Sequence, residues 1–302
     1  MKAPFPWFGG KSRAAIEIWQ RFGDVQNYVE PFAGSLAVLL LRPHTPRTET
    51  VNDIDCYLAN FWRALQHEPE SVSNWADSPV NEADLHARHL WLLGREEFRQ
   101  RMKSDPDYYD VKIAGWWVWG ICQWIGSGWC ASDCYFDGNA GMGVHRPSQQ
   151  LPQLGSAGMG VHDYLYAIAQ RLRNVRVACG DWSRVTGDSV TFRHGMTGVL
   201  LDPPYSHDER QDDLYANDHD VAGDVRLWAI ENGDNPLLRI ALCGYEGEHD
   251  MPKGWAAYRW KAKGGYGSQG NGIGRENASR ECIWFSPHCV KHELPLFALA
   301  AD

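Results

Sequence analysis

Two kinds of hydrophobic pattern alternate along this chain. Short apolar runs that end in glycine, proline or acidic residues predict buried strands, whereas apolar positions three or four residues apart predict amphipathic helices. The predicted strands are residues 28–30, 51–55, 175–179, 199–201, 239–243, 255–262 and 281–285. The predicted helices are residues 14–22, 35–40, 57–65, 164–172 and 225–232. This alternation is typical of an α/β fold.

The middle of the chain interrupts this pattern. Up to about residue 125 it reads mainly as helices, and from there to residue 160 it is irregular and rich in glycine. We therefore expect residues 66–160 to form a smaller inserted lobe that is largely helical. Residues 1–65 and 161–302 are expected to form the main domain.

The inserted region is also dense in tryptophan, and we expect most of these rings to form the packed core of the lobe. The alternative is that one or two of them stack on bases or wedge into a duplex. The residues are Trp116, Trp117, Trp119, Trp124 and Trp129. Two copies of Ala-Gly-Met-Gly-Val-His follow, at 140–145 and 157–162, which are too few for a solenoid.

The start of the chain resembles a nucleotide-binding unit. Gly9 and Gly10 precede Lys11 at the start of a helix, although the first glycine of a Walker A loop is missing. The next strand leads into a tight turn at 30–34, and the strand after that ends in Asp53. A strand, turn, helix, strand and acid in this order form one half of an open nucleotide-binding sheet, in which the acid binds ribose hydroxyls.

The strand at 199–201 ends in Asp202, Pro203, Pro204 and Tyr205. The prolines cannot continue a hydrogen-bonded ladder, so the Pro203 carbonyl is free to accept a hydrogen bond. The Asp202 carboxylate is a second acceptor, and Tyr205 is expected to expose a ring face for stacking. Two acceptors beside a stacking platform suit the amino group of a nucleobase that has left its helix. The plainer alternative is a polar turn after a buried strand.

Together these motifs resemble the Dam-like DNA adenine methyltransferases. That family has a GGK segment, an EPFxG-type loop, an acid-tipped strand, an inserted target-recognition region and a DPPY motif, and all occur here in this order. A lesser match covers residues 280–285. The resemblance implies a Rossmann-like methyltransferase sheet with helices on both faces. It also implies transfer of a methyl group from S-adenosylmethionine to adenine N6 of a flipped-out base in DNA, which leaves S-adenosylhomocysteine.

The resemblance also implies roles for individual residues. Asp202, Pro203, Pro204 and Tyr205 would hold the adenine, without a metal or a covalent enzyme intermediate. Lys11 and Glu30 would lie near the methionine end of the methyl donor, and Asp53 near its ribose, with Asp55 a weaker candidate. Asp181 and Trp182 would border its adenine, and the alternative for Asp181 is the N-cap of a short helix. The full set of implied cofactor residues is Trp7, Gly10, Lys11, Glu30, Pro31, Phe32, Gly34, Asp53, Asp181 and Trp182.

One position departs from the family pattern. Where the family has a second glycine two residues after Gly34, this chain has Leu36. We expect its side chain to narrow the cofactor pocket or to tilt the methionine end of the cofactor.

Composition changes this picture in one respect. The 302 residues carry a formal net charge of −9, so any surface that neutralises DNA phosphates has to be local. The candidates are Arg95, Arg99, Arg101, Lys103, Arg146, Lys261, Lys263, Arg275 and Arg280.

The eight cysteines form neither a disulfide framework nor a CxxC pair. Cys122, Cys130 and Cys134 with Asp133 match no zinc spacing well, so no metal is expected. Because the sequence has no apolar run near 18 residues and no signal peptide, we expect a cytoplasmic protein, bacterial or encoded by a phage and acting in its host. A monomer is favoured, and restriction–modification, phage protection and regulation all remain open.

Three other functions stay open from the sequence. Cytosine N4 methylation would use the same scheme on another amine. A DNA-binding homologue with weakened catalysis is favoured by Leu36 and opposed by the intact DPPY motif. A nicotinamide-dependent oxidoreductase is opposed by the single glycine of the 30–36 loop, because a pyrophosphate needs close backbone approach at more than one glycine.

Overall fold

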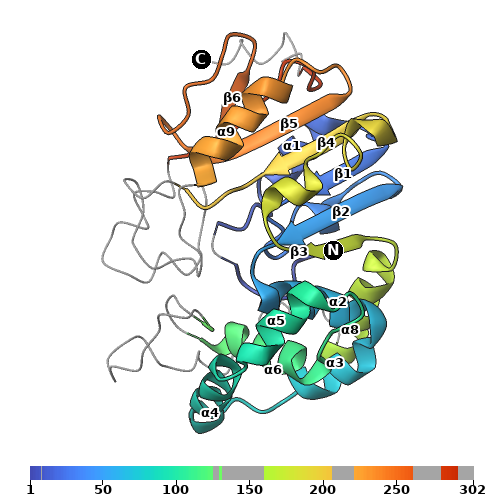
Figure 1. Ribbon diagram of the computed structural model, residues 1–302, viewed down its shortest axis with the longest axis vertical. Helices are drawn as coiled ribbons and strands as arrows, with labels where there is room; N and C mark the ends of the chain where they lie inside the picture. Colours follow the sequence, from blue (N-terminus) through green and yellow to red (C-terminus); the bar gives the residue numbers. More distant parts are fainter. Residues whose placement is uncertain (8, 125–128, 131–159, 206–220, 261–279, 292–302) are drawn as a thin grey trace, which may run out of the picture.

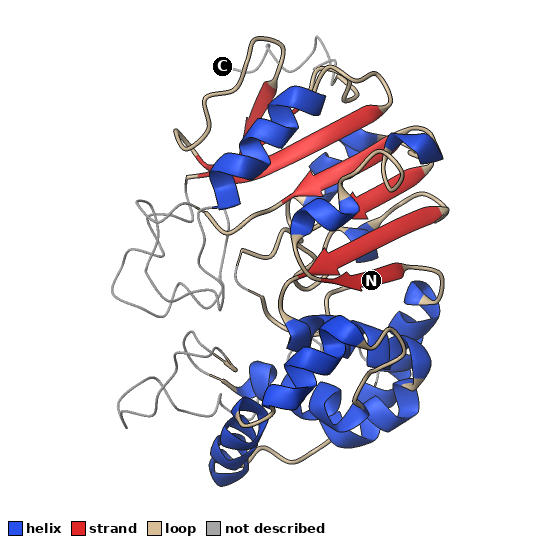
Figure 2. Cartoon of the chain, in the orientation of Figure 1, coloured by secondary structure: helices blue, strands red, loops and turns tan. Residues whose placement is uncertain are grey.

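The computed structural model describes residues 1–7, 9–124, 129–130, 160–205, 221–260 and 280–291, and all that follows concerns these residues. Their strands form one sheet in the order β3-β2-β1-β4-β5-β7-β6 (Figures 1 and 2). Neighbouring strands from β3 to β5 are parallel, whereas β7 runs antiparallel to both β5 and β6. The strands are β1 (Asn27–Glu30), β2 (Thr48–Asp53), β3 (Arg176–Cys179), β4 (Thr197–Leu201), β5 (Leu238–Tyr245), β6 (Ala256–Arg259) and β7 (Glu281–Phe285).

Helices cover both faces of this sheet, as expected for a Rossmann-like fold. Successive strand residues point to opposite faces, so Tyr28 and Val29 of β1 belong to two different cores. The core that contains Tyr28 includes apolar residues of α1 (Ala15–Phe22), α2 (Cys56–His67) and α8 (Val161–Leu172). The core that contains Val29 includes apolar residues of α9 (Val221–Asn232) and η3 (Trp182–Val185). The predicted fold class is confirmed.

The helical lobe consists of α3 (Pro69–Ala76), α4 (Glu82–Leu93), α5 (Glu96–Ser104) and α6 (Val111–Gln123). Helices α2 and α8 of the main domain lie against it (Figure 1). Asn60 of α2 ties the lobe to the main domain, because its side chain donates to the Asp110 carbonyl (2.9 Å) and accepts from the Asp110 amide (2.7 Å). One core runs through both parts. The division at residues 65 and 160 stays a prediction.

The tryptophans pack inside the lobe, as predicted. Trp117, Trp119 and Trp124 are at most 3% exposed. Trp117 belongs to the main core, against which Trp116 and Trp129 pack, whereas Trp119 and Trp124 form a small separate cluster with Leu85. Outside the described residues lie the first glycine-rich repeat, residues 157–159 of the second, Cys134, Asp133, Arg146, Lys261, Lys263 and Arg275. Within the described parts, no helix is long and apolar enough to cross a membrane, and no three potential metal ligands lie together.

The predicted helix at residues 35–40 is wrong. The chain there forms turns and one short 3-10 helix, η1 (Leu39–Leu41). Gly34 and Leu36 adopt left-handed φ values of 47° and 56°, which a right-handed helix cannot contain. Side chains from elsewhere bind the carbonyls that a helix would satisfy internally: Trp19 donates to Val38 O (2.8 Å) and Trp62 to Gly34 O (3.2 Å).

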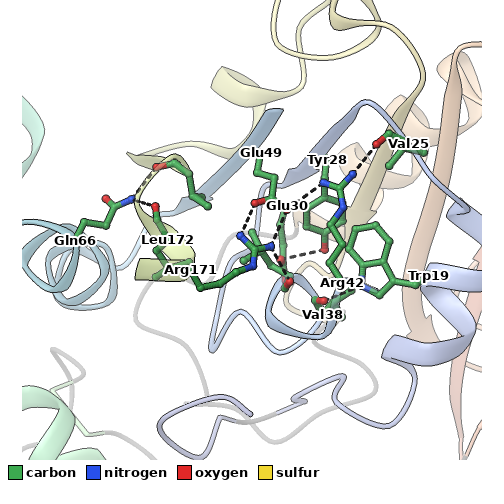
Figure 3. A network of polar contacts seen from close by, with 12 residues as sticks. Trp19, Val25, Tyr28, Glu30, Val38, Arg42, Glu49, Gln66, Arg171 and Leu172 are labelled. Carbon is green, nitrogen blue, oxygen red and sulfur yellow. Dashed lines mark hydrogen bonds and ion pairs between the residues drawn. The ribbon is translucent and has the colours of Figure 1, made fainter. Parts of the chain in front are cut away.

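A buried ion-pair network holds the end of this loop (Figure 3). Arg171 of α8 binds both carboxylate oxygens of Glu49, at 2.7 and 2.8 Å, and also donates to Leu39 O. Arg42 reaches the same carboxylate at 3.0 Å and donates to Val25 O. The loop after β1 is therefore fixed by side chains of α1, α2, β2 and α8 rather than by its own helix.

Leu36 gives a prediction about stability. Its side chain is fully buried in the core, so the expectation that it narrows a cofactor pocket is wrong. We expect Leu36→Gly to relieve about 1 kcal/mol of left-handed strain, but to lose roughly 2–5 kcal/mol of packing. The variant should therefore be less stable than the wild type in urea unfolding. An equal or greater stability would show that backbone strain outweighs packing at this position.

Candidate active site

The candidate residues gather at the carboxyl ends of the parallel strands. The sheet order reverses between β1 and β4, since β2 and β3 extend it on one side and β5 on the other. In open α/β sheets, ligands bind at this switch point. The 30–34 loop follows β1 and the Asp202–Tyr205 segment follows β4, so the two principal motifs leave neighbouring strands side by side.

Lys11 is the centre of the polar contacts. It lies just before α1, is 3% exposed, and its Nζ is 2.9 Å from Asp202 Oδ1. The same ammonium donates to the Tyr205 hydroxyl (2.9 Å) and to Gly9 O (2.7 Å). Burial alone would lower the pKa of Lys11, but the Asp202 and Glu281 carboxylates raise it above its ordinary value. Lys11 is therefore a fixed positive charge bound to Asp202, a partner that the sequence does not indicate.

Asp202 keeps one edge open, since its side chain is 22% exposed. Burial raises the pKa of its carboxyl, and the charge of Lys11 opposes this shift. Pro203 is buried and Pro204 is half-buried. No described residue donates a hydrogen bond to the Pro203 carbonyl. These are the two acceptors that the sequence predicts.

Tyr205 differs from the prediction. Its ring is only 7% exposed, because the hydroxyl is bound by Lys11 and donates to Glu281 Oε2 (2.8 Å). The ring packs edge to face on Tyr245, with centroids 4.4 Å apart. The expected exposed ring face is thus wrong for this state of the protein.

Asp53, Gly34 and Trp7 come together at the end of β2. Asp53 Oδ2 accepts from the Gly34 amide (3.1 Å), and its Oδ1 accepts from the Asp55 amide (3.0 Å). A Cβ on Gly34 would lie 2.7 Å from Trp7 Nε1, so only glycine fits there. Burial first, and then the charge of Asp55, raise the pKa of Asp53 to about 7.

Two other acids have local structural partners. Asp55 caps α2 and accepts from the Tyr57 amide (2.8 Å). Asp181 caps η3 and accepts from the Ser183 amide (2.9 Å), so the N-cap alternative for Asp181 is confirmed. Its neighbour Trp182 faces Phe32, with ring centroids 6.4 Å apart and planes 26° apart. These two rings form an apolar wall at the ends of β1 and β3.

Of the other predicted cofactor residues, Glu30 and Pro31 are buried and Gly10 is exposed. Glu30 is 4% exposed and accepts from the Tyr28 hydroxyl (3.0 Å), and its burial raises its pKa well above the usual range. Gly10 donates to Trp7 O (3.3 Å). The Pro31 carbonyl accepts from Asn52 Nδ2 (3.0 Å).

Sequence reasoning missed three residues of this region. Asn52 donates to both Pro31 O and Gly180 O, so it joins the loop after β1 to the loop after β3. Cys243 of β5 is fully buried beside Asp202. Glu281 of β7 binds Tyr205 and lies 3.7 Å from Lys11 Nζ. In the sequence, Asn52 and Glu281 could have been noticed as polar side chains near the carboxyl end of β2 and at the first position of β7.

Comparison with known proteins shows what the first part of the chain is similar to. Residues 7–112 match the D12 class N6 adenine-specific DNA methyltransferase family. Over this stretch, about a third of the chain, the sequence is similar to that family. The D12-class match contains Lys11, the 30–34 loop and Asp53, and it ends before Asp202. The description of the matched family names adenine N6 methylation, and so it favours this reaction over the cytosine and nicotinamide alternatives.

A curated relative is also a methyltransferase. The chain is 24% identical over 219 residues to the Type II methyltransferase M.MjaIII of Methanocaldococcus jannaschii. The aligned region covers 66% of this chain and 67% of the relative.

Proposed function

We propose that the carboxyl edge between β1 and β4 holds S-adenosylmethionine beside a flipped-out adenine of DNA, and that Asp202 and the Pro203 carbonyl bind the adenine amino group. The observation that carries this proposal is the Lys11–Asp202 pair, which fixes a partly open carboxylate at the switch point of the sheet. Asp202 accepts from the N6 hydrogens, and this favours a pyramidal nitrogen with a localised lone pair. Positioning and local electrostatics then supply most of the rate.

The residues at the ends of β1, β2 and β3 fit the methyl donor. Asp53 uses one lone pair of each oxygen for a backbone amide, so both oxygens keep acceptor capacity for ribose hydroxyls. Phe32 and Trp182 offer an apolar surface to its adenine. Gly34, which has no Cβ, lets the loop pass close to Trp7. We assign Glu30, Gly10 and Pro31 to the methionine end.

When bound, S-adenosylmethionine supplies a methyl group on a sulfonium: the N6 lone pair forms the N–C bond, the C–S electron pair stays on sulfur, and one N6 proton leaves to water. Lys11 orients Asp202 for this step, and Asp202 orients the amine. Tyr205, once its ring face is uncovered, stacks on the adenine. The lobe of residues 66–160 contacts the target DNA, with α5 contributing Arg99, Arg101 and Lys103.

The direct test is tritium transfer from labelled S-adenosylmethionine to unmethylated DNA, followed by separation of the nucleosides. We expect the label in N6-methyladenosine. Label in N4-methylcytidine, or no label in any nucleoside, would overturn the proposal. The cytoplasmic location, the monomeric state and a role in restriction, phage protection or regulation stay predictions.

Asp53 gives a pH prediction. Its pKa is raised from 3.8 to about 7, so the folded protein takes up a proton there and this group lowers stability as pH rises from about 4 to 7. Ribose hydroxyls donate best to the ionised carboxylate. The Kd for S-adenosylmethionine should therefore fall about tenfold between pH 6 and pH 8.

Isothermal titration calorimetry on the wild type and Asp53→Asn checks this prediction. The variant should bind more weakly at pH 8 and lose the pH dependence. A wild-type Kd that does not change with pH would remove Asp53 from the ribose site.

A further inference from the structure

A buried cluster of four side chains lies behind the proposed adenine site. We call Lys11, Asp202, Tyr205 and Glu281 the Lys11 cluster. They come from the segment before α1, the loop after β4 and the strand β7. Glu281 is 5% exposed, and its position on β7 opposite Tyr245 of β5 directs it to the cluster. This acid, which lies more than 70 residues beyond Tyr205 in the chain, is not part of either principal motif.

The hydrogen bonds of the Lys11 cluster have a fixed direction. Lys11 can only donate, so the Tyr205 hydroxyl accepts from it at 2.9 Å. The single proton of that hydroxyl is then donated to Glu281 at 2.8 Å. Glu281 is thereby the acceptor that fixes the Tyr205 hydroxyl. A residue without an acceptor at this place would leave the hydroxyl free to turn toward Asp202.

The charges of the cluster do not balance. One ammonium faces two carboxylates, with Asp202 at 2.9 Å and Glu281 at 3.7 Å. Because these side chains are buried, their charges interact strongly. Lys11 is shared between the two carboxylates, so each of them is neutralised less than it would be in a simple pair. Burial, the Lys11 charge and the Tyr205 hydrogen bond act together on Glu281, and the net result is a pKa above its usual range. Among the described residues, Glu30 of β1 and Cys243 of β5 are further titratable groups that act on the cluster, and Cys282 of β7 acts on Cys243.

We propose that Glu281 is a positioning residue for methyl transfer: it fixes the Tyr205 hydroxyl and shares Lys11 with Asp202, so that Asp202 is oriented by the lysine without being fully neutralised by it. The inference rests on the proposed function. It makes Asp202 a stronger acceptor for the N6 hydrogens than a simple lysine–aspartate pair would be, because acceptor strength follows basicity.

Glu281→Gln separates the two roles of Glu281, which are to fix the Tyr205 hydroxyl and to share Lys11 with Asp202. The amide oxygen still accepts from the Tyr205 hydroxyl, but the side chain no longer competes for Lys11. We expect kcat at pH 7.5 to fall roughly three- to tenfold with KM for S-adenosylmethionine unchanged, and the acid limb of the kcat profile to move to lower pH. Glu281→Ala, which also loses the acceptor, should lower kcat further. Glu281→Asp should restore part of the pH profile.

Glu246→Gln is the matched control. Like Glu281, which follows Arg280 in the chain, Glu246 is a glutamate next to Arg280, and its amide donates to the Arg280 carbonyl. Unlike Glu281, it is about half exposed and pairs with the exposed Arg259. This variant should keep the wild-type kcat and pH profile. An unchanged pH profile in Glu281→Gln, whatever its thermal midpoint, would mean that Glu281 is merely structural and would overturn the inference.

A readout without turnover keeps this test apart from the test of the function. In protein with ¹³C-labelled aspartate carboxyls, the Asp202 signal is assigned as the one lost in Asp202→Asn. Its titration midpoint should be lower in Glu281→Gln than in the wild type. If wild-type protein transfers no methyl group to adenine, the proposed function fails. If it does transfer but the Asp202 midpoint does not move, only the inference on Glu281 fails.

Discussion

We expect Asp202→Ala to lower kcat for adenine methylation by about 10³-fold or more, because it removes the charged acceptor that acts on the reacting nitrogen. Binding of S-adenosylmethionine should change little, since the residues assigned to its ribose and adenine lie on β1, β2 and β3. Single-turnover tritium transfer and calorimetric binding measure the two effects separately.

The fold should survive this change. Without Asp202, Lys11 keeps the Gly9 carbonyl at 2.7 Å and the Glu281 carboxylate at 3.7 Å, so no isolated charge is left in the core. Asp202→Asn, which keeps the shape and one acceptor oxygen, is the control for charge and should retain more activity than the alanine variant. Wild-type turnover by Asp202→Ala would exclude Asp202 from catalysis and with it the assignment of the site.

The strand ends that carry the site were predictable from sequence. Val199–Leu201 and the strand before Glu30 are short and fully buried, and acids or prolines follow them directly. The carboxyl ends of parallel strands meet at one edge, so Asp202, the 30–34 loop and Asp53 had to lie near one another once the order of elements was known. The helical lobe and its tryptophan core followed from the same hydrophobic period.

The pairing of side chains was not predictable. The contact of the Lys11 ammonium with Asp202 was not predicted, because a distance of this kind depends on how α1 packs on the sheet. The place of Lys11 near the methionine end of the methyl donor stays a prediction. Tyr205 was expected to be exposed, but its hydroxyl donates to Glu281 of the antiparallel strand β7, and its ring is buried. The prediction of a helix at residues 35–40 was wrong for a local reason. Apolar residues favour a helix there, but the left-handed backbone at Gly34 and Leu36 prevents it.

The largest expected loss of stability follows from Glu49. Its carboxylate, 2% exposed, is the partner of two arginines, and the Arg42 side chain is fully buried. Glu49→Ala leaves that guanidinium without a counter-charge, which costs about 3–5 kcal/mol in the free energy of unfolding. Urea unfolding followed by tryptophan fluorescence measures this loss.

The control for Glu49 is another acid that binds an arginine in the same part of the chain. Asp24 pairs with Arg47 at 3.1 Å, but both side chains are about half exposed, so Asp24→Ala should cost less than about 1 kcal/mol. Because Arg42 and Arg171 also hold Val25 O and Leu39 O, Glu49→Ala should in addition loosen the loop after β1 and weaken binding of S-adenosylmethionine. A stability equal to that of Asp24→Ala would mean that the loop after β1 keeps its left-handed turns at Gly34 and Leu36 without these ion pairs.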